Sequence, residues 1–226
     1  MRYAVPDGHS RENRNKMKQL IHFTICILAA MLLSYSCAEG PANQKAGKWS
    51  SEEKELIGNQ ADEVMRVLSV ADKDDSLFLR KKVKDLNAGM LAGDYYKTLA
   101  QRMIATVTSP EQDGVGIAGP QVGISRRIVA VQRFDKENEP FEVYPQIRIT
   151  AVHGEKSPGW EGCLSVPDMS GEVLRYRKID ISYISSNTLR DTSETVEGFT
   201  AVIFQHECDH LEGVLYTDYL EGFGSK

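Results

Sequence analysis

The sequence predicts an α+β domain in which antiparallel strands pack around a central metal-binding helix. Three segments have the alternation or the β-branched composition of strands, and two have helical periodicity. The strand segments are residues 127–133, 142–152 and 178–185, and the helical segments are residues 95–108 and 199–212. The second helix carries two histidines four residues apart, which places both on one helical face.

The first predicted helix covers residues 95–108. Leu99, Met103 and Ile104 fall on one face at helical spacing, so that face should pack against a core. Ser109-Pro110 should end the helix, because proline cannot continue it. The three strand segments follow and are expected to pair antiparallel.

The second predicted helix, residues 199–212, contains the sequence HECDH at positions 206–210. Val202, Ile203 and Leu211 place apolar side chains around the two histidines. The helix should therefore be buried on most sides and provide a rigid base for two ligands.

His206 and His210 can bind one divalent cation, and Glu207 between them can take and give a proton. A catalytic cation usually takes three protein ligands and keeps one position for water. One protease pattern has a third histidine where this chain has Tyr216, and only sixteen residues follow His210 to supply a glutamate from a later helix. The third ligand should therefore lie upstream.

Cys163 is the best candidate for that ligand. A thiolate binds iron(II), zinc, nickel or cobalt strongly, and Gly162 before it lets the backbone come close to a metal. Cys208 falls on a different helical face from the histidines and is expected to pack against the core. With Glu207 as the base for a water molecule, the pattern indicates a metallohydrolase.

Three motifs in this order resemble those of the peptide deformylase family. They are residues 114–123 (GVGIAGPQVG), 161–165 (EGCLS) and 206–210 (HECDH), and the resemblance covers roughly residues 64–226. It implies an α+β fold and the removal of the formyl group from N-terminal formylmethionine. The substrates would be N-formylmethionyl peptides or proteins.

The resemblance also implies the metal site. Cys163, His206 and His210 would hold one divalent ion, which is iron(II) in many members of the family, with zinc, nickel or cobalt as alternatives. Glu207 would be the general acid and base.

Four further residues take roles from the resemblance. The side-chain amide of Gln121 and the backbone N–H of Leu164 would donate hydrogen bonds to the developing oxyanion. Gly116 and Ile117 would line the substrate cleft, where a peptide can add as a strand.

Two acidic residues near the motifs have less specific interpretations. Glu161 is expected to form a structural ion pair, with Arg175 as the candidate partner. Asp209 is expected either to accept a proton from a ligand histidine or to cap a loop.

Residues 1–37 are predicted to be an N-terminal extension with a lipoprotein-like signal peptide. The apolar run 20–33 follows two lysines and is too short to span a bilayer comfortably. Residues 34–37 resemble a bacterial lipoprotein cleavage box, in which Cys37 would carry lipid. A plain amphiphilic leader or a short membrane anchor is the alternative.

Residues 38–53 are expected to form a disordered polar tether, followed by a catalytic domain at 54–226. Residues 1–36 contain five of the 27 basic and two of the 32 acidic residues, so the remainder has a formal charge of −8. Such an acidic body gives no reason to expect nucleic-acid binding. The sequence gives no indication of the oligomeric state.

The predicted location and the predicted function conflict. A lipoprotein signal would attach the domain to the membrane in the cell envelope, whereas nascent chains are deformylated in the cytoplasm. The domain would be cytoplasmic if the leader does not act as a signal. Two other functions stay open: a metallopeptidase or amidase, and a lipoprotein that binds a metal or formylated peptides without turnover.

Overall fold

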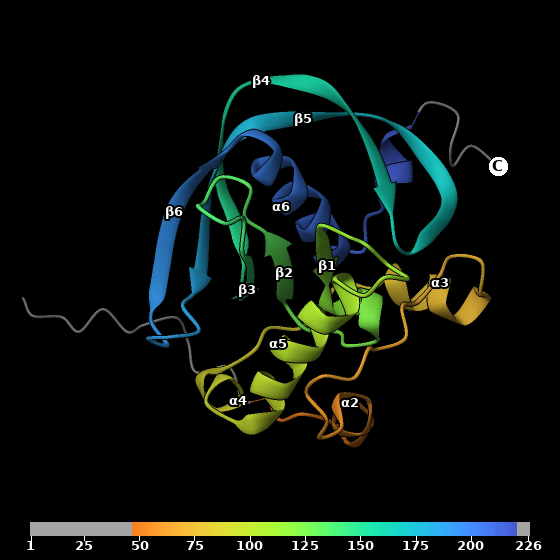
Figure 1. Cartoon of the computed structure of the whole chain (residues 1–226), viewed down its shortest axis with the longest axis vertical. Helices are drawn as coiled ribbons and strands as arrows, with labels where there is room; N and C mark the ends of the chain where they lie inside the picture. Colours follow the sequence, from red (N-terminus) through yellow and green to blue (C-terminus); the bar gives the residue numbers. More distant parts are fainter. Residues whose placement is uncertain (1–46, 221–226) are drawn as a thin grey trace, which may run out of the picture. The chain divides into compact units, whose positions relative to one another are not determined.

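A three-stranded antiparallel sheet lies at the centre of the domain, with helices on both faces (Figure 1). The computed structural model of the protein describes residues 47–220. The strands of this sheet are ordered β1-β2-β3, with bounds β1 (Gly116–Ala118), β2 (Ile128–Gln132) and β3 (Phe141–Pro145). The strand predicted at residues 127–133 is therefore confirmed as β2.

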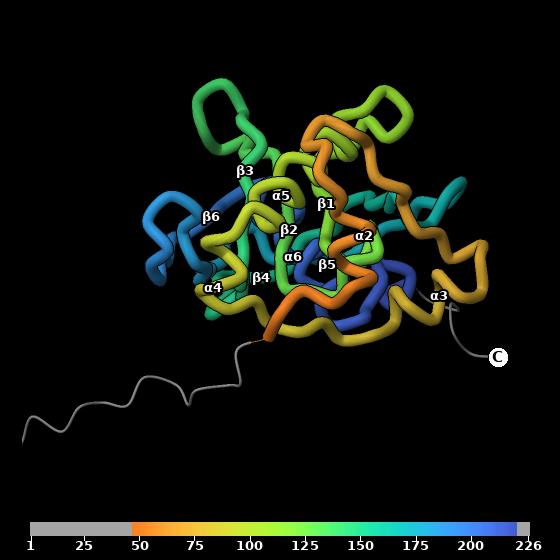
Figure 2. Tube along the Cα trace, turned by 90° about the horizontal axis from the view of Figure 1, so that it is seen from below, coloured from red at the N-terminus to blue at the C-terminus, as the bar shows by residue number. Residues whose placement is uncertain are grey.

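The helices occupy the two sides of this sheet. Their bounds are α2 (Ser51–Ile57), α3 (Lys73–Leu79), α4 (Ala88–Leu91), α5 (Asp94–Val107) and α6 (Gly198–Leu211), with short 3-10 helices η1 (Gly119–Val122) and η2 (Tyr216–Tyr219). The two helices predicted at 95–108 and 199–212 are confirmed as α5 and α6, each within one residue at both ends. Figure 2 shows α2, α4 and α5 together on one side of the domain.

Alternation along β2 divides the interior into two cores. Ile128 and Ala130 pack with α5, whereas Val129 and Val131 pack with α6. All four side chains are fully buried, because successive residues of a strand point to opposite faces and both faces are covered. The face of the sheet that carries Val129 and Val131 therefore supports α6.

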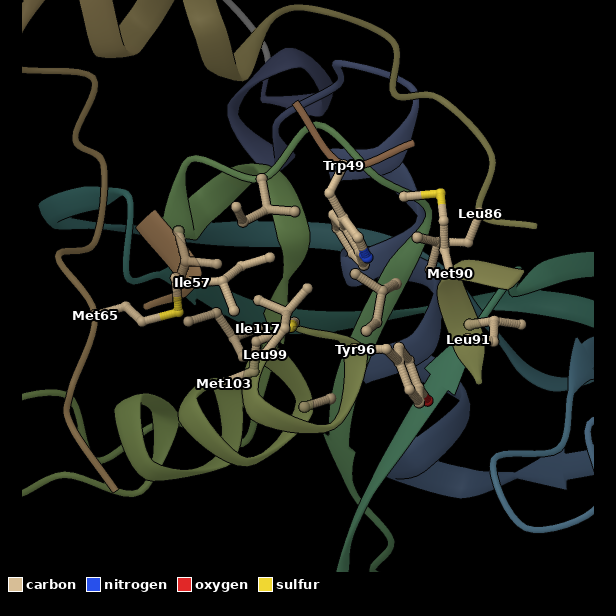
Figure 3. Packing of buried hydrophobic residues seen from close by; sticks show 14 of the residues in the cluster. Trp49, Ile57, Met65, Leu86, Met90, Leu91, Tyr96, Leu99, Met103 and Ile117 are labelled. Carbon is tan, nitrogen blue, oxygen red and sulfur yellow. The ribbon is translucent and has the colours of Figure 1, made fainter. Parts of the chain in front are cut away.

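The core between the sheet and α5 includes residues from the start of the described chain. Figure 3 shows Trp49, Met90, Leu99 and Met103 among the side chains that fill it. Leu99 and Met103 are fully buried, as the helical periodicity predicts.

A second antiparallel sheet has the order β4-β5-β6, with bounds β4 (Arg148–Cys163), β5 (Val166–Ile184) and β6 (Asp191–Glu197). The long β4–β5 hairpin passes over α6 (Figure 1), and α6 also contacts β1 and β2. This arrangement confirms the α+β fold with a central buried helix. The strand predicted at 178–185 is only the last part of β5, and the alternation did not indicate β6.

The prediction of one strand at 142–152 is wrong. The chain forms β3, turns at Gln146, and then starts β4 in the other sheet. Gln146 has φ 60°, and its side-chain amide donates to and accepts from the backbone of Leu86 at 2.5 and 3.1 Å. Because alternation continues across this residue, the pattern could not locate the change of sheet.

The predicted boundary at residue 54 is also wrong. Trp49 is only 8% exposed, and Ser50 forms a capping box with Glu53 at the start of α2. Glu53 also pairs with Arg126, with Nε–Oε1 at 2.6 Å. The last residues of the predicted tether therefore belong to the folded domain, while residues 1–46 lie outside the described residues. Within residues 47–220, the helices are too short or too polar to cross a membrane.

Candidate active site

α6 places three functional side chains of the HECDH segment in the interior. The rings of His206 and His210 meet edge to face with centroids 5.1 Å apart. His210 is 1% exposed and Glu207 is 3% exposed. The apolar side chains that pack α6 against the central sheet thus fix two imidazoles and a carboxyl group on one rigid element.

Cys163 reaches the histidines from the end of β4. The short turn between β4 and β5 begins after Cys163, and its Sγ lies 3.3 Å from His210 Nε2. One ligand atom each from Cys163, His206 and His210 lies within 4.8 Å of the other two. The structure therefore brings together the three predicted ligands from two distant parts of the sequence.

This cluster fits a divalent metal ion. A thiolate and two imidazoles form a donor set suited to iron(II), zinc, nickel or cobalt. Within residues 47–220, Glu207 Oε2 is buried without a hydrogen-bond partner. Because buried polar atoms are normally satisfied, such an atom beside a compact ligand cluster fits a site built for an ion and water.

Glu161 orients one of the ligands. Its Oε2 accepts a hydrogen bond from His206 Nδ1 at 2.9 Å, so Nε2 is left to face the cluster. Arg175 donates to both oxygens of Glu161, at 2.8 and 3.1 Å, which confirms the expected ion pair. Burial alone would raise the pKa of Glu161, but hydrogen bonds from His206 and Arg175 lower it to about 2.

Asp209 takes neither of the two roles expected for it. Its carboxylate accepts from Arg175 Nη1 at 2.6 Å, and Arg175 also lies over the ring of Tyr219, 4.8 Å from the centroid. His206 donates its hydrogen bond to Glu161 and not to Asp209. Arg175 therefore connects α6 to the strand that carries Cys163.

Glu207 lies against the backbone of β1. A Cβ atom on Gly116 would come within 2.5 Å of Glu207 Oε1, so a glycine is needed there. Burial raises the pKa of Glu207 to about 7, even though neighbouring His206 opposes the shift. A carboxyl group that titrates near neutral pH is suited to both accepting and donating a proton.

Gln121 is held with its amide nitrogen toward the metal ligands. Its Oε1 accepts from the backbone N–H of Ala118 at 2.8 Å. Its Nε2 lies 3.3 Å from Ser165 Oγ and 3.6 Å from Cys163 Sγ. The donor group of this 1% exposed side chain is thus fixed in advance.

Comparisons with known proteins agree with this geometry. Residues 64–225 match the family model described as polypeptide deformylase. The chain belongs to this family. A peptide deformylase of Leptospira biflexa is 36% identical over 151 residues, which cover 63% of this chain and 82% of the relative. One of Symbiobacterium thermophilum is 37% identical over 161 residues, which cover 68% of this chain and 67% of the relative.

Solved structures of deformylases have the same fold. A class I type b peptide deformylase from Acinetobacter baumannii, bound to Met-Ala-Ser, is 32% identical and superimposes with a TM-score of 0.62 over 70% of this chain and 99% of that one. The peptide deformylase of Thermotoga maritima is 31% identical, with the same TM-score and the same coverage of both chains. The segment 47–63 precedes the region that matches the deformylase family model.

A cavity of about 330 Å³ opens beside the deformylase ligands. Gly116, Gln121 and Leu164 line it, as the resemblance implies. Ile117 does not: its side chain is fully buried in the core with α5. The expected contribution of Ile117 to the cleft is therefore limited to its backbone on β1.

Sequence reasoning missed several residues of this deformylase site. Val202, Phe199 and Trp160 line the cavity, and Ser165 holds the amide of Gln121. Tyr216 stacks on His206 with centroids 6.0 Å apart. Ser165 has a signal in the sequence because it belongs to the EGCLS motif, and Val202 has one because its helical spacing places it near the two histidines.

Proposed function

We propose that the chain removes the formyl group from the N-terminal formylmethionine of peptides or proteins, with one divalent ion held by Cys163, His206 and His210. The observation that carries this proposal is the meeting of these three ligands with Glu207 in a member of the peptide deformylase family. A bound ion supplies Lewis acidity, which makes water a nucleophile near neutral pH and polarises a carbonyl group.

Glu207 handles the proton in this proposal. It takes a proton from the attacking water and passes it to the amine that leaves, and its buried position keeps bulk water from competing. Gly116 sets where the carboxyl group lies, because its missing side chain leaves the space that Glu207 Oε1 occupies.

Gln121 and Leu164 are proposed to stabilise the charge that develops on the formyl oxygen. The amide nitrogen of Gln121 is fixed beside Cys163, and Leu164 lies in the turn that follows Cys163. Both residues line the cavity. Donors fixed in advance act without reorganisation, and losing one typically costs about 100-fold or more in rate.

Two sheet edges are available to hold the peptide. β1 is the edge of the first sheet and β4 is the edge of the second, and both contribute residues to the cavity wall. An edge strand offers unpaired N–H and C=O groups to an added strand. An extended peptide can therefore lie along the cavity with its formyl end near the ligands.

The metal is proposed to be iron(II). A cysteine ligand makes such a site sensitive to air, because both the iron and the thiolate can be oxidised. Metal analysis of protein purified without oxygen tests this choice. One equivalent of zinc with full activity would contradict it.

The N-terminal segment is proposed to attach the enzyme to the membrane of the cell envelope through a lipid on Cys37. The apolar run 20–33 and the small residue Ser36 directly before Cys37 support this proposal. Incorporation of a labelled fatty acid into the full chain, lost in Cys37→Ser, would be the expected result. A labelled Cys37→Ser protein or an unlabelled full chain would contradict it.

Anaerobic hydrolysis of formyl-Met-Ala-Ser by the full chain loaded with iron(II) or nickel tests the function. We expect turnover that is lost with a chelator and reduced about 100- to 10,000-fold in Glu207→Gln, the range of general acid–base catalysis. Glu197→Gln, at the exposed start of α6, is the matched control and should keep full activity. Equal turnover of unformylated Met-Ala-Ser would indicate a peptidase instead.

A further inference from the structure

Two large side chains at the mouth of the cavity are exposed. Trp160 is 73% exposed and Phe199 is 48% exposed, and both line the cavity. Leu174, which is 56% exposed, lies on the strand paired with Trp160. Exposed tryptophan beside a binding cavity is informative, because such side chains often contribute strongly to binding when they are covered.

The direction of Trp160 follows from the pleat of β4. The side chain of Glu161 points to α6, where it accepts from His206. Trp160 and Gly162 flank Glu161, so both lie on the opposite, outer face of the strand. Pro158 lies on the same face, directly across from Leu174.

Gly162 leaves an open space next to Trp160. A Cβ atom on Gly162 would meet only the carbonyl oxygen of Met169, at 3.8 Å. The outer face of this edge strand therefore has open space at Gly162, two residues from Trp160 on the same face, and we call this space the notch. The notch lies one residue before the metal ligand Cys163.

The alternation of an extended peptide decides which side chain reaches the notch. A peptide paired with the edge of β4 points successive side chains to the α6 face and to the outer face. The methionine side chain needs an apolar environment, which Val202 and Ile203 of α6 supply on the inner side of the cavity. The next side chain then lies on the outer face, beside Gly162 and Trp160.

We propose that Trp160 and the notch at Gly162 select the residue that follows formylmethionine, with preference for an aromatic or large aliphatic side chain. This inference rests on the proposed function, because it uses the same cavity and the same peptide direction. Glu172 is exposed directly across from Trp160 and disfavours an acidic residue at that position. The expected order of kcat/KM for formyl-Met-X-Ser is phenylalanine, leucine, alanine, aspartate.

The test compares formyl-Met-Phe-Ser with formyl-Met-Ala-Ser. We expect kcat/KM to be about tenfold higher for the phenylalanine peptide, the size of effect that one apolar contact gives. In Trp160→Ala this ratio should fall close to one. Val152→Ala, a change of another exposed apolar residue on β4 that does not line the cavity, should leave the ratio unchanged. A ratio near one in the unmodified enzyme, or a tenfold ratio retained in Trp160→Ala, would overturn the inference.

Fluorescence gives a readout that does not need turnover. The chain has two tryptophans, of which Trp49 is buried and Trp160 is exposed, so acrylamide should quench mainly Trp160. Met-Phe-Ser should protect Trp160 from quenching more than Met-Ala-Ser does, and Trp160→Phe should remove the difference. Equal protection by the two peptides would contradict the inference. Protection by Met-Phe-Ser without hydrolysis of any formyl peptide would reject the proposed function and still support the notch.

Discussion

α6 and the β4–β5 hairpin contribute to the same site in different ways. α6 is buried on most sides and supplies His206, Glu207 and His210 from five consecutive positions. The hairpin supplies Cys163 and Glu161 from the end of an edge strand whose outer face is exposed. The buried helix fixes the proposed base and two of the proposed ligands, and the exposed strand completes the site beside the cavity.

Arg175 connects these two regions by charged contacts. It donates to Glu161 on β4 and to Asp209 on α6, and it is only 6% exposed. Buried charges are tolerated when they are paired in this way. Loss of a ligand from either region should therefore remove the metal, whereas loss of Arg175 should only weaken metal binding.

Removing a ligand from either region should have the largest effect. Cys163→Ala takes the only ligand from the hairpin, and His210→Ala takes one of the two from α6. We expect both variants to lose the bound metal and to have activity below detection, because a site with two protein ligands binds poorly. Emission spectroscopy measures the metal content, and hydrolysis of formyl-Met-Ala-Ser measures the activity.

Cys208→Ala is the matched control for the cysteine. Cys208 lies on α6 and packs, partly buried, against the core, as the sequence predicts, and it is not one of the three clustered ligands. It should keep one equivalent of metal. A Cys163→Ala protein with normal metal content would refute the role of the hairpin.

Gly116→Ala should disturb the base without touching a ligand. The added methyl group would lie 2.5 Å from Glu207 Oε1 and 2.8 Å from Ile203, so the carboxyl group must move. A displacement of about 1 Å in a catalytic group can cost about 100-fold in kcat. Metal content should stay at the unmodified level. Gly93→Ala, where the new atom would make only ordinary contacts at 3.6 Å, should keep full activity.

Arg175→Met should weaken the connection between the two regions. Without Arg175, Glu161 keeps its hydrogen bond to His206 but loses its ion pair, and loss of such partners typically lowers metal affinity about 10- to 100-fold. Competition with a chelator measures the affinity directly. Arg177→Met, two residues along the same strand, is the control, because among residues 47–220 the side chain of Arg177 donates only to the carbonyl oxygen of Pro158. Equal affinities in the two variants would show that Arg175 has no such role.

The smallest effect is expected where the two sheets are joined. Arg133 at the end of β2 pairs with Asp135 and with Glu194 on β6, at 2.7 and 3.0 Å. The guanidinium group of Arg133 lowers the pKa of Asp135. Because the folded pKa lies below the unfolded value of about 3.9, Asp135 stabilises the fold above that pH and loses this contribution as the pH falls further.

Asp135→Asn should therefore lower the free energy of unfolding by about 1–2 kcal/mol at pH 7. The difference from the unmodified protein should shrink as the pH falls below about 4. Urea unfolding at several pH values measures both effects. A difference that does not change with pH would contradict the ionic origin of this contribution.

Local patterns were sufficient for some elements and misleading for others. The apolar periodicity around Leu99 and the HECDH segment predicted α5 and α6 to within one residue. The same reasoning joined β3 to β4, because Gln146 interrupts the strand by its backbone conformation and not by its side-chain type. It also placed the start of the domain after Trp49, which packs into a core that forms only from distant segments.

The sequence by itself indicated the proposed ligands, the proposed base and the family, because a metal and a proton-transfer group require particular residue types, and the HECDH segment has them at a helical spacing. Tertiary structure alone decided that Arg175 also reaches Asp209 on α6, that Ile117 faces the core, and that Trp160 is exposed beside the cavity. Those three facts depend on how strands and a helix from distant parts of the chain pack together. No local spacing encodes which faces such elements present to one another.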